Sequence, residues 1–539
     1  MNQPQLTVLV LAGGSLAGKT LGPAPPLWQH PLLLPAGSGL AVHQTLRFYR
    51  EGPLPVSIRL VVDEPPPAAV PLHGLEPELL QAIAPQPHIL GTLKTALASV
   101  TTPWVLINPI TTLPSRPAEL RCQIQVGDQA LIREDWSALQ QQPDGSWRFE
   151  SKADPRSEQA SAPFTGIVVA PLGQLQALLT GVPAAEGFDL LHLAQLLVQH
   201  GGAAVVPTPW HDLGHRTTHA SSRRSRLPSR AFNRLHHCRR RDVIVKQSVD
   251  AERLQAERAY LAALPGGLQR HFPALLHGEA GEDEALVMEA IPFPSLAELH
   301  LHWDLGPNAW LAILERLAAI QAEFRNAAAP LSGPSAWLYG TKLQQRWQGF
   351  RASAHEHTWW QQHLQINGRH HAPLAEQIQI LLTALEPLQA QSSLQLIHGD
   401  FCFNNILCDP LYTAIRLIDP RGEAAPSANL PRGYGDSRYD LVKLFHSVAG
   451  HYDAIVNNLF RLRWQTSNAL ELEVYTPPHQ AFLARAFEAV LKPTDLSLQE
   501  LQLLTSSLFF SMLPLHQEDT ERQLALAVSG MLMLESALA

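Results

Sequence analysis

The feature that most constrains this chain is a run of polar residues between apolar strands in its C-terminal half. The segment LQLIHGDFCFNNILCD, residues 394–409, predicts a strand, a loop with His398 and Asp400, and a second strand that begins after Asn405. A further strand, AIRLIDPRG, ends at Asp419. Loops at strand ends let carboxylate and amide oxygens converge, and Mg²⁺ prefers oxygen ligands of this kind.

These residue types match the needs of phosphoryl transfer. One carboxylate, Asp400, is placed to orient an attacking hydroxyl group and accept its proton. Asn405 and Asp419 are placed to hold Mg²⁺ against the phosphates of a nucleotide. The tripeptide H-G-D alone is compatible with an ordinary turn. The full order of strand, HGDxxxxN, strand and Asp favours a catalytic centre.

Two upstream segments carry the expected partners of a nucleotide. The short strand DVIVKQS places Lys246 near its end, where an ammonium can reach the α- and β-phosphates of ATP. The next helix, AERLQAERAYLAAL, places Glu257 eleven residues further on, facing back toward that lysine. Glu252 is the competing acid, but at the helix start it can also act only on the helix dipole.

A candidate adenine site follows. The segment EALVMEAIPFPSLAEL predicts a strand, a hinge from Met288 to Ile291, and a helix. The hinge backbone can hydrogen-bond an adenine ring. An ordinary strand-to-helix connection has the same composition, so both interpretations stay open.

With these motifs in place, residues 229–450 resemble the aminoglycoside phosphotransferase and choline kinase superfamily, the small-molecule branch of the protein-kinase-like fold. The G-D-x-x-Y-D-L segment of that family matches residues 435–441. The resemblance implies an ATP- and Mg²⁺-dependent small-molecule kinase, in which His398 orients the catalytic loop and Asp440 braces it from behind. The HGDxxxxN motif and the metal-binding Asp of the family map onto His398, Gly399, Asp400, Asn405 and Asp419.

Two departures from the family pattern stand out. The loop before Lys246, SRAFNRLHHCRRRD, contains no glycine, so phosphate cover must come from Ser229, Asn233 or neighbouring backbone amides. Asp419 is followed by Pro-Arg-Gly, which is not the commonest family sequence. Arg421 there can bind a second anionic group of the substrate or form a structural salt bridge.

The pattern of predicted strands and helices along the chain indicates two domains. From Leu6 to about His215, the apolar runs LTVLVLA, SIRLVVD, PWVLINP and FTGIVVAP alternate with helical patterns, which predicts an α/β domain with a largely parallel, Rossmann-like sheet. From Asp242 onward, a few strands give way to long amphipathic helices, which predicts an α+β domain with a helical C-lobe. The predicted boundaries are 1–218 for the first domain and 219–539 for the second, whose N-lobe covers about 225–290 and C-lobe about 291–539.

The N-terminal glycines admit two interpretations. Residues Gly13 to Thr20 satisfy G-x-x-x-x-G-K-[ST], and Asp63 resembles the acidic end of a P-loop partner strand. A P-loop must open into a helix, however, and the following LGPAPPLWQHP blocks one. The turn VLVLAGGS, with Gly13 and Gly14, instead resembles the nucleotide-packing turn of sugar nucleotidyltransferases, and the resemblance extends over residues 6–218.

The catalytic motifs of that second family are eroded here. His30 stands where a lysine is usual, and Asn108 stands where an Asp is expected. Only Asp212 survives of the metal-binding pair, and Lys19 or Lys94 could substitute in phosphate binding. The domain is therefore expected to bind a nucleotide-sugar or to act as a scaffold, and a purely structural role stays open.

Composition excludes several other classes. The net charge of −8 argues against a nucleic-acid partner, so the arginine-rich stretch 223–241 is expected to connect domains. The four cysteines form no disulfide framework, and the histidines have no zinc-site spacing. No signal peptide or transmembrane segment is expected, so a cytoplasmic enzyme is predicted.

The function expected from the sequence is phosphorylation of a small-molecule hydroxyl by ATP and Mg²⁺. Fusions of this kind resemble proteins of capsule and surface-polysaccharide biosynthesis, which favours a sugar, polyol or amino alcohol acceptor. Two alternatives stay open: a nucleotidyltransferase that makes an activated sugar or alcohol, and a nucleotide-binding pseudo-enzyme scaffold.

Overall fold

The protein forms two compact units, one of Met1–Ala68 with Gly74–Arg226 and one of Ala69–His73 with Leu227–Ala539. The domain boundary expected at residues 218–219 stays a prediction. The computed structural model describes residues 3–14, 26–37, 39–86, 88–128, 136–151, 161–183, 187–215, 218–219, 222, 233–238, 240–278, 285–354, 358–421, 430–492 and 496–539.

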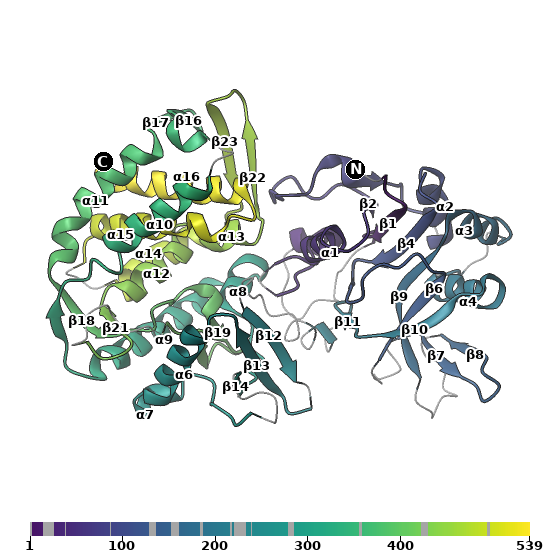
Figure 1. The fold of residues 1–539 in the computed structure, drawn as a ribbon, viewed down its shortest axis with the longest axis horizontal. Helices are drawn as coiled ribbons and strands as arrows, with labels where there is room; N and C mark the ends of the chain where they lie inside the picture. The colour runs from purple at the N-terminus through teal and green to yellow at the C-terminus, as the bar shows by residue number, and fades with distance from the viewer. Residues whose placement is uncertain are drawn as a thin grey trace. The chain divides into compact units, whose positions relative to one another are not determined.

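The first unit is built on a mixed sheet with the strand order β10-β6-β9-β4-β1-β2-β3 (Figure 1). Strand β1 pairs in parallel with β2 and β4, whereas β9 runs antiparallel between β4 and β6. The strands are β1 (Leu6–Leu11), β2 (Val56–Val62), β3 (Leu80–Ala82), β4 (Trp104–Pro109), β6 (Gln123–Gly127), β9 (Ala162–Pro171) and β10 (Ala204–Thr208).

Helices cover both faces of this sheet, which explains why its central strands are almost continuously apolar. Helices α2, α3 and α4 lie together on one side, and α1 lies on the other (Figure 1). The α/β class predicted for this half is confirmed. The helices are α1 (Ala41–Arg50), α2 (Ile89–Ala98), α3 (Leu172–Thr180) and α4 (Leu190–Gly201), and the short strand pairs are β5 (Thr112–Leu113) with β11 (His211–Asp212) and β7 (Ala138–Gln141) with β8 (Trp147–Glu150).

The second unit begins with a small antiparallel sheet in the order β12-β13-β14. Strand β13 begins with three consecutive buried apolar residues, and the buried Lys246 follows them. Asp250 then caps helix α6 by accepting a hydrogen bond from Arg253 N. The elements are β12 (Asn233–Cys238), β13 (Val243–Ser248), β14 (Leu286–Glu289), α6 (Ala251–Ala263) and α7 (Gly266–Gln269).

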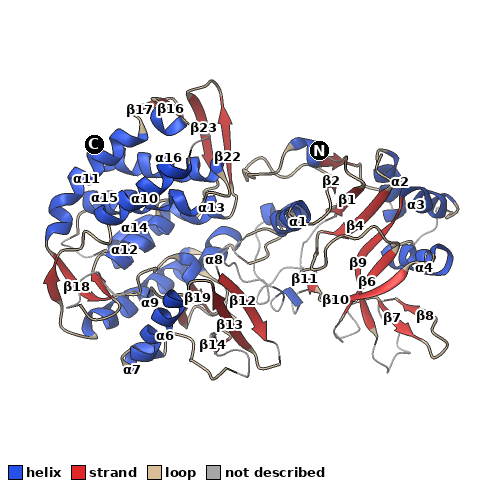
Figure 2. Ribbon diagram, viewed as in Figure 1, coloured by secondary structure: helices blue, strands red, loops and turns tan. Residues whose placement is uncertain are grey.

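Helices dominate the remainder of the second unit (Figure 2). Helices α15 and α16 approach so closely that a Cβ atom on Gly530 would lie 2.5 Å from the Phe510 ring. The α+β class with a helical C-terminal part is therefore confirmed. The helices are α8 (Leu296–His302), α9 (Pro307–Asn326), α10 (Gly340–Ser353), α11 (Leu374–Ala390), α12 (Tyr439–Val448), α13 (Tyr452–Val456), α14 (Gln480–Val490), α15 (Leu498–Met512) and α16 (Thr520–Leu538).

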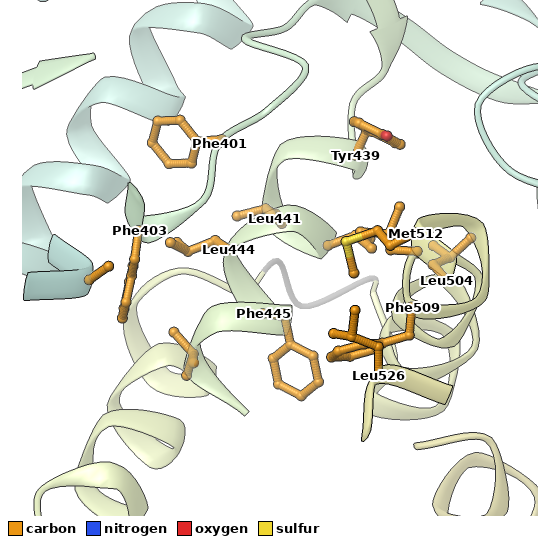
Figure 3. Packing of buried hydrophobic residues seen from close by; sticks show 14 of the residues in the cluster. Phe401, Phe403, Tyr439, Leu441, Leu444, Phe445, Leu504, Phe509, Met512 and Leu526 are labelled. Atoms are coloured by element: carbon orange, nitrogen blue, oxygen red, sulfur yellow. The ribbon is translucent and has the colours of Figure 1, made fainter. Parts of the chain in front are cut away.

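Helix α12 is central to the core of this unit. Figure 3 shows Leu441, Leu444 and Phe445 of α12 directed into the same cluster as Phe509 and Met512 of α15. Each of these side chains is buried, and full burial of one such side chain stabilises the fold by about 1.5–3 kcal/mol. The apolar face of α12 thus fixes the position of its polar face.

Short strands are inserted among the helices. Strand β18 pairs with β15 and β21, β19 pairs with β20, and β16, β17, β22 and β23 form a four-stranded sheet. The strands are β15 (Leu331–Gly333), β16 (Leu364–Ile366), β17 (Arg369–His371), β18 (Ser392–Leu396), β19 (Ile406–Cys408), β20 (Ile415–Leu417), β21 (Tyr434–Asp436), β22 (Phe460–Trp464) and β23 (Ala469–Val474).

The segment Ala69–His73 also belongs to the second unit. The His73 ring stacks on Phe460 with 4.4 Å between centroids. Its Nε2 atom lies 2.9 Å from Asp519 Oδ2, and its Nδ1 atom lies 3.2 Å from Glu521 Oε2. Across the described ranges, the helices include none that is both long and apolar enough to cross a membrane.

Candidate active site

The loop between β18 and β19 carries the HGDxxxxN residues. Gly399 has a φ of +79°, and a Cβ atom there would lie 2.7 Å from Cβ of Arg421, so both the backbone angle and the space favour glycine. The Nδ2 atom of Asn405 donates a hydrogen bond to the Asp400 carbonyl at 3.0 Å. This bond closes the loop and leaves Asn405 Oδ1 as the only amide atom that can ligate a metal ion.

His398 lies fully buried behind this loop. Its Nδ1 atom accepts a hydrogen bond from Asp400 N at 3.2 Å, and its ring stacks on Phe272 with 5.8 Å between centroids. Burial lowers the pKa of His398 to about 4, so the imidazole is neutral at pH 7. A buried, neutral imidazole whose Nδ1 already accepts a hydrogen bond is suited to orienting the loop, not to taking a proton from a substrate.

Helix α12 begins behind the same loop. Asp440 accepts hydrogen bonds from His398 N and Gly399 N, both at 2.8 Å. Burial raises the pKa of Asp440 to about 6, and the two backbone hydrogen bonds act against that rise. Asp440 therefore holds two backbone amides of the loop that carries Asp400.

The structure brings Lys246, Glu257 and Asp419 together. Lys246 Nζ lies 2.5 Å from Glu257 Oε2 and 2.6 Å from Asp419 Oδ1. Burial acts to lower the pKa of Lys246, but the charges of Asp419 and Glu257 outweigh it and raise that pKa. Of the two acids weighed in the sequence, Glu257 is buried at the lysine and Glu252 is exposed in the first turn of α6.

Asp419 follows the last residues of strand β20 in an uncommon backbone conformation. Its φ is +55°, which costs free energy in a residue other than glycine and marks a locally constrained site. The neighbouring Ile418 N donates to the Asn405 carbonyl at 3.0 Å, so the two predicted metal ligands occupy adjacent positions at the end of the β19–β20 pair. One carboxylate and one amide oxygen fit Mg²⁺, which takes few protein ligands and completes its shell with phosphates and water.

The Asp400 carboxylate lies between two cations that the motifs did not predict as its partners. Lys443 Nζ lies 2.9 Å from Asp400 Oδ1, and Arg421 Nη2 lies 3.4 Å from Asp400 Oδ2. The sequence left two roles open for Arg421, binding of a substrate anion or a salt bridge within the protein. In the structure, Arg421 forms a salt bridge with Asp400. Lys443 could have been found from its spacing, because it follows Asp440 by three residues on a helix and so shares its face.

Residues 182–420 match the family model described as the phosphotransferase enzyme family. The match includes Lys246, Glu257, the HGDxxxxN loop and Asp419. This region of the chain is a phosphotransferase-family domain. The match begins at Val182, inside the first compact unit, and ends at Pro420, before helix α12.

Solved structures of two kinds are also similar to the chain. A candidate fructosamine-3-kinase from Thermobifida fusca covers 55% of this chain and 85% of its own, with 15% identity and a TM-score of 0.32. A candidate glucose-1-phosphate thymidylyltransferase from Bacillus anthracis covers 42% and 98%, with 11% identity and a TM-score of 0.30. The inositol-1-phosphate CTP transferase from T. maritima covers 40% and 92%, with 13% identity and a TM-score of 0.28. No curated protein matches the chain.

The predicted adenine hinge of the phosphotransferase domain lies at the end of the small sheet. Met288 is buried in β14 opposite Ile244 of β13, and the half-buried Ile291 follows the strand. Asn233 is the first residue of β12 and pairs with Ser248. The Asn233 side chain and the whole of Ser229 lie outside the described residues, so their predicted part in phosphate cover stays a prediction.

The two cysteines beside the catalytic loop are buried thiols. Burial raises the pKa of Cys408 to about 12, and burial together with the charge of Asp400 raises the pKa of Cys402 further. Thiols held in the protonated form are poor nucleophiles. Their environment favours small apolar side chains in the phosphotransferase core.

In the first unit, the side chain of Asp63 packs against the glycine turn that follows β1. Gly14 N donates a hydrogen bond to Asp63 Oδ2 at 2.6 Å, and a Cβ atom on Gly13 would lie 2.6 Å from Asp63 Oδ1. The Asp63 carboxylate thus already accepts the hydrogen bond of the Gly14 amide, which an incoming phosphate would need. Residues 15–25, which include Lys19 and the rest of the P-loop pattern, lie outside the described residues.

The two residues that the sequence placed at an eroded metal site, Asn108 and Asp212, form hydrogen bonds within the first unit. Asn108 is fully buried, and its Oδ1 atom accepts from Tyr49 Oη at 2.7 Å. The Asp212 carboxylate accepts from Gly214 N at 3.2 Å and from the Thr218 hydroxyl, and it lies 2.9 Å from His215 Nδ1. Both residues therefore act as local structural groups in this conformation.

Proposed function

We propose that the chain transfers a phosphoryl group from ATP to a hydroxyl group of a small molecule, with Mg²⁺. The observation that supports this most directly is the convergence of Lys246 on both Glu257 and Asp419, beside a loop that presents Asp400 and Asn405. Phosphoryl transfer depends mainly on positioning and charge stabilisation, and these side chains provide both.

Each residue has a distinct part in the proposal. Asp400 orients the acceptor hydroxyl and takes its proton. Asn405 and Asp419 would hold Mg²⁺ through their side-chain oxygens, and Lys246, kept in place by Glu257, would contact the α- and β-phosphates. When bound, the magnesium nucleotide supplies the phosphoryl group and the positive charge that the protein ligands do not. Met288 to Ile291 would bind the adenine ring through backbone groups.

A sugar or polyol hydroxyl is the favoured acceptor, with amino alcohols next, by resemblance to proteins of surface-polysaccharide biosynthesis. The test is ADP formation by the full-length chain with Mg²⁺ over a panel of sugars, polyols and amino alcohols, comparing wild type with Asp400→Asn. Asp304→Asn serves as the matched control because Asp304 is an exposed carboxylate on the loop before α9. Acceptor-dependent ADP formation that survives Asp400→Asn would refute the proposal.

The alternative of a nucleotidyltransferase in the first unit has weaker support, because Asp63 fills the glycine turn and Asn108 is fully buried. Pyrophosphate release from CTP or another nucleoside triphosphate, lost in Asp212→Asn, would favour that alternative. A wild-type chain that turns over no nucleotide with any acceptor would instead favour a nucleotide-binding scaffold.

A further inference from the structure

Lys342 lies at a position where helix stability disfavours a lysine. It is the third residue of α10, and the first turn of that helix contains no acidic side chain. The positive end of a helix dipole lies at the N-terminus, so a carboxylate is preferred in the first turn and a cation is unfavourable there. The helix itself therefore gives no reason for a positive charge at this place.

The contacts of Lys342 are made with a single phenol. Its Nζ atom donates a hydrogen bond to Tyr439 Oη at 2.8 Å and lies 5.3 Å from the centroid of the same ring. In the described part of the chain, no carboxylate forms an ion pair with this half-buried ammonium. A neutral phenol orients an ammonium through its hydroxyl group and its ring, but it does not neutralise the charge.

The carboxylates closest to Tyr439 in the chain have other partners. Asp440 accepts hydrogen bonds from His398 N and Gly399 N, both at 2.8 Å. Asp436 Oδ2 lies 2.7 Å from Arg438 Nη2, and Asp436 Oδ1 accepts from Arg438 N at 2.9 Å. The positive charge on α10 is thus available to an anionic group of a bound molecule.

Tyr439 connects this lysine to the proposed acceptor site. It is the first residue of α12, and Lys443 follows it by four residues on the same side of the helix. Lys443 Nζ lies 2.9 Å from Asp400 Oδ1. The nucleotide is expected at Lys246 on the small sheet, whereas Lys342 and Tyr439 belong to the helices that reach Asp400 from the other part of the unit. A molecule whose hydroxyl group meets Asp400 can therefore extend toward Lys342.

We propose that the acceptor carries an anionic group, a carboxylate or a phosphate, and that Lys342 binds this group. The proposal rests on the proposed function and narrows its acceptor to a hydroxyl compound such as a sugar acid or a sugar phosphate. Tyr439 Oη keeps the ammonium oriented in the free protein, and the anion adds the charge that the phenol lacks. Lys342 is then a residue that determines specificity, and Asp400 remains the group that meets the hydroxyl.

The test is ADP formation by the full-length chain with MgATP and acceptors that differ only in an anionic group. Each sugar and polyol of the panel is compared with its acid and its phosphate ester, for example glucose with glucuronate and glucose 6-phosphate. We expect an anionic member to have a kcat/KM on the order of 10-fold above that of its neutral parent, because a charge-assisted hydrogen bond is gained. The two arms tell a carboxylate acceptor from a phosphorylated one.

Substitution of Lys342 identifies the group that recognises the anion. Lys342→Met should raise KM for the anionic acceptor roughly 10- to 100-fold and leave kcat and the kcat/KM of the neutral parent nearly unchanged. Lys342→Arg should retain most of the preference, because the charge remains. Lys492→Met is the matched control, because Lys492 is also half-buried and its Nζ atom donates to one neutral oxygen, that of Leu496, at 2.9 Å.

Urea unfolding separates binding from structural support. Because a lysine in the first turn of a helix is disfavoured by the dipole, Lys342→Met should leave the urea midpoint unchanged or raise it. A loss of activity that is equal for neutral and anionic acceptors would overturn the proposal, and a lower urea midpoint would then identify Lys342 as a structural residue.

Failure of this proposal can be told from failure of the proposed function. Wild type that uses neutral and anionic acceptors with equal kcat/KM would overturn only the anionic acceptor. The same conclusion follows if an anionic acceptor is preferred and Lys342→Met keeps that preference in full. Wild type that forms no ADP with any member of the extended panel would overturn the proposed function itself.

Discussion

Lys246 and Asp419 are 173 positions apart in the chain, yet the ammonium of one lies 2.6 Å from the carboxylate of the other. Lys246 also binds Glu257 at 2.5 Å. One buried cation thus joins the central strand of the small antiparallel sheet, helix α6 and the residues that follow strand β20. Because a buried cation without partners is costly, the three side chains depend on one another.

Glu257 and Glu252 provide a matched pair of substitutions on the same helix. Glu257→Gln should lower kcat/KM for ATP by about 10- to 100-fold, because Lys246 loses the carboxylate that holds it in place. Glu252→Gln should leave kcat/KM nearly unchanged, because Glu252 is exposed at the helix start. Steady-state ADP formation measures both, and equal effects of the two substitutions would contradict the predicted role of Glu257.

Replacement of Asp440 by Asn should loosen the catalytic loop. Asn offers one acceptor oxygen for two loop amides, so one buried N–H loses its partner at a cost of about 1–3 kcal/mol of unfolding free energy. Urea denaturation at pH 7 measures this cost, and a variant as stable as wild type would speak against the bracing role.

The same residue gives a pH prediction. Burial raises the pKa of Asp440 to about 6, above its value of about 3.9 in an unfolded chain. The folded state then binds more protons between these values, so the contribution of Asp440 is fully present below pH 3.9 and is lost as pH rises through 6. Asp440→Asn should remove this decline from the stability curve measured between pH 4 and 7.

The contact of His73 with Asp519 should stabilise the second unit with the opposite pH dependence. Burial acts to raise the pKa of Asp519, but hydrogen bonding and charge from His73 outweigh it and lower the pKa to about 2. The stability from Asp519 is therefore present above pH 3.9 and is lost as pH falls through 2.

His73→Ala should lower the unfolding free energy at pH 6 by roughly 1–3 kcal/mol, since it removes a partly buried ring and its hydrogen bonds to carboxylates. It should also reduce the loss of stability between pH 4 and 2. His370→Ala is the control, because His370 is exposed in β17. Acid unfolding curves that coincide for His73→Ala and wild type would exclude this contribution.

Asp212→Asn should affect stability and not phosphoryl transfer. The Asp212 carboxylate binds the Thr218 hydroxyl and the Gly214 amide within the first unit. An amide side chain retains one acceptor oxygen, so a loss of about 1–2 kcal/mol is expected in thermal or urea unfolding of that unit. ADP formation with any acceptor should remain at the wild-type level. A large loss of nucleotide turnover would point to a catalytic first unit.

The sequence alone determined the features that depend on local pattern. The apolar runs of the first half predicted its α/β class, because buried parallel strands lack polar alternation. The HGDxxxxN spacing and the order of Lys246, Glu257 and Asp419 selected the residues that the structure brings together. The proline-rich stretch after Thr20 also argued against a P-loop, because its prolines disfavour the helix that must follow such a loop.

Tertiary structure alone decided features that arise from residues distant in the chain. The pairing of β16 with β23 joins three-residue and six-residue strands about a hundred positions apart, and such short strands leave no periodic signal. The contact of Asp63 with the glycine turn and the contact of Lys443 with Asp400 likewise join residues far apart in the chain and leave no periodic signal in the sequence. Motif spacing predicts which groups a reaction needs. The packing of α12 against the core decides which cation reaches the Asp400 carboxylate, because that depends on how distant apolar faces are buried together.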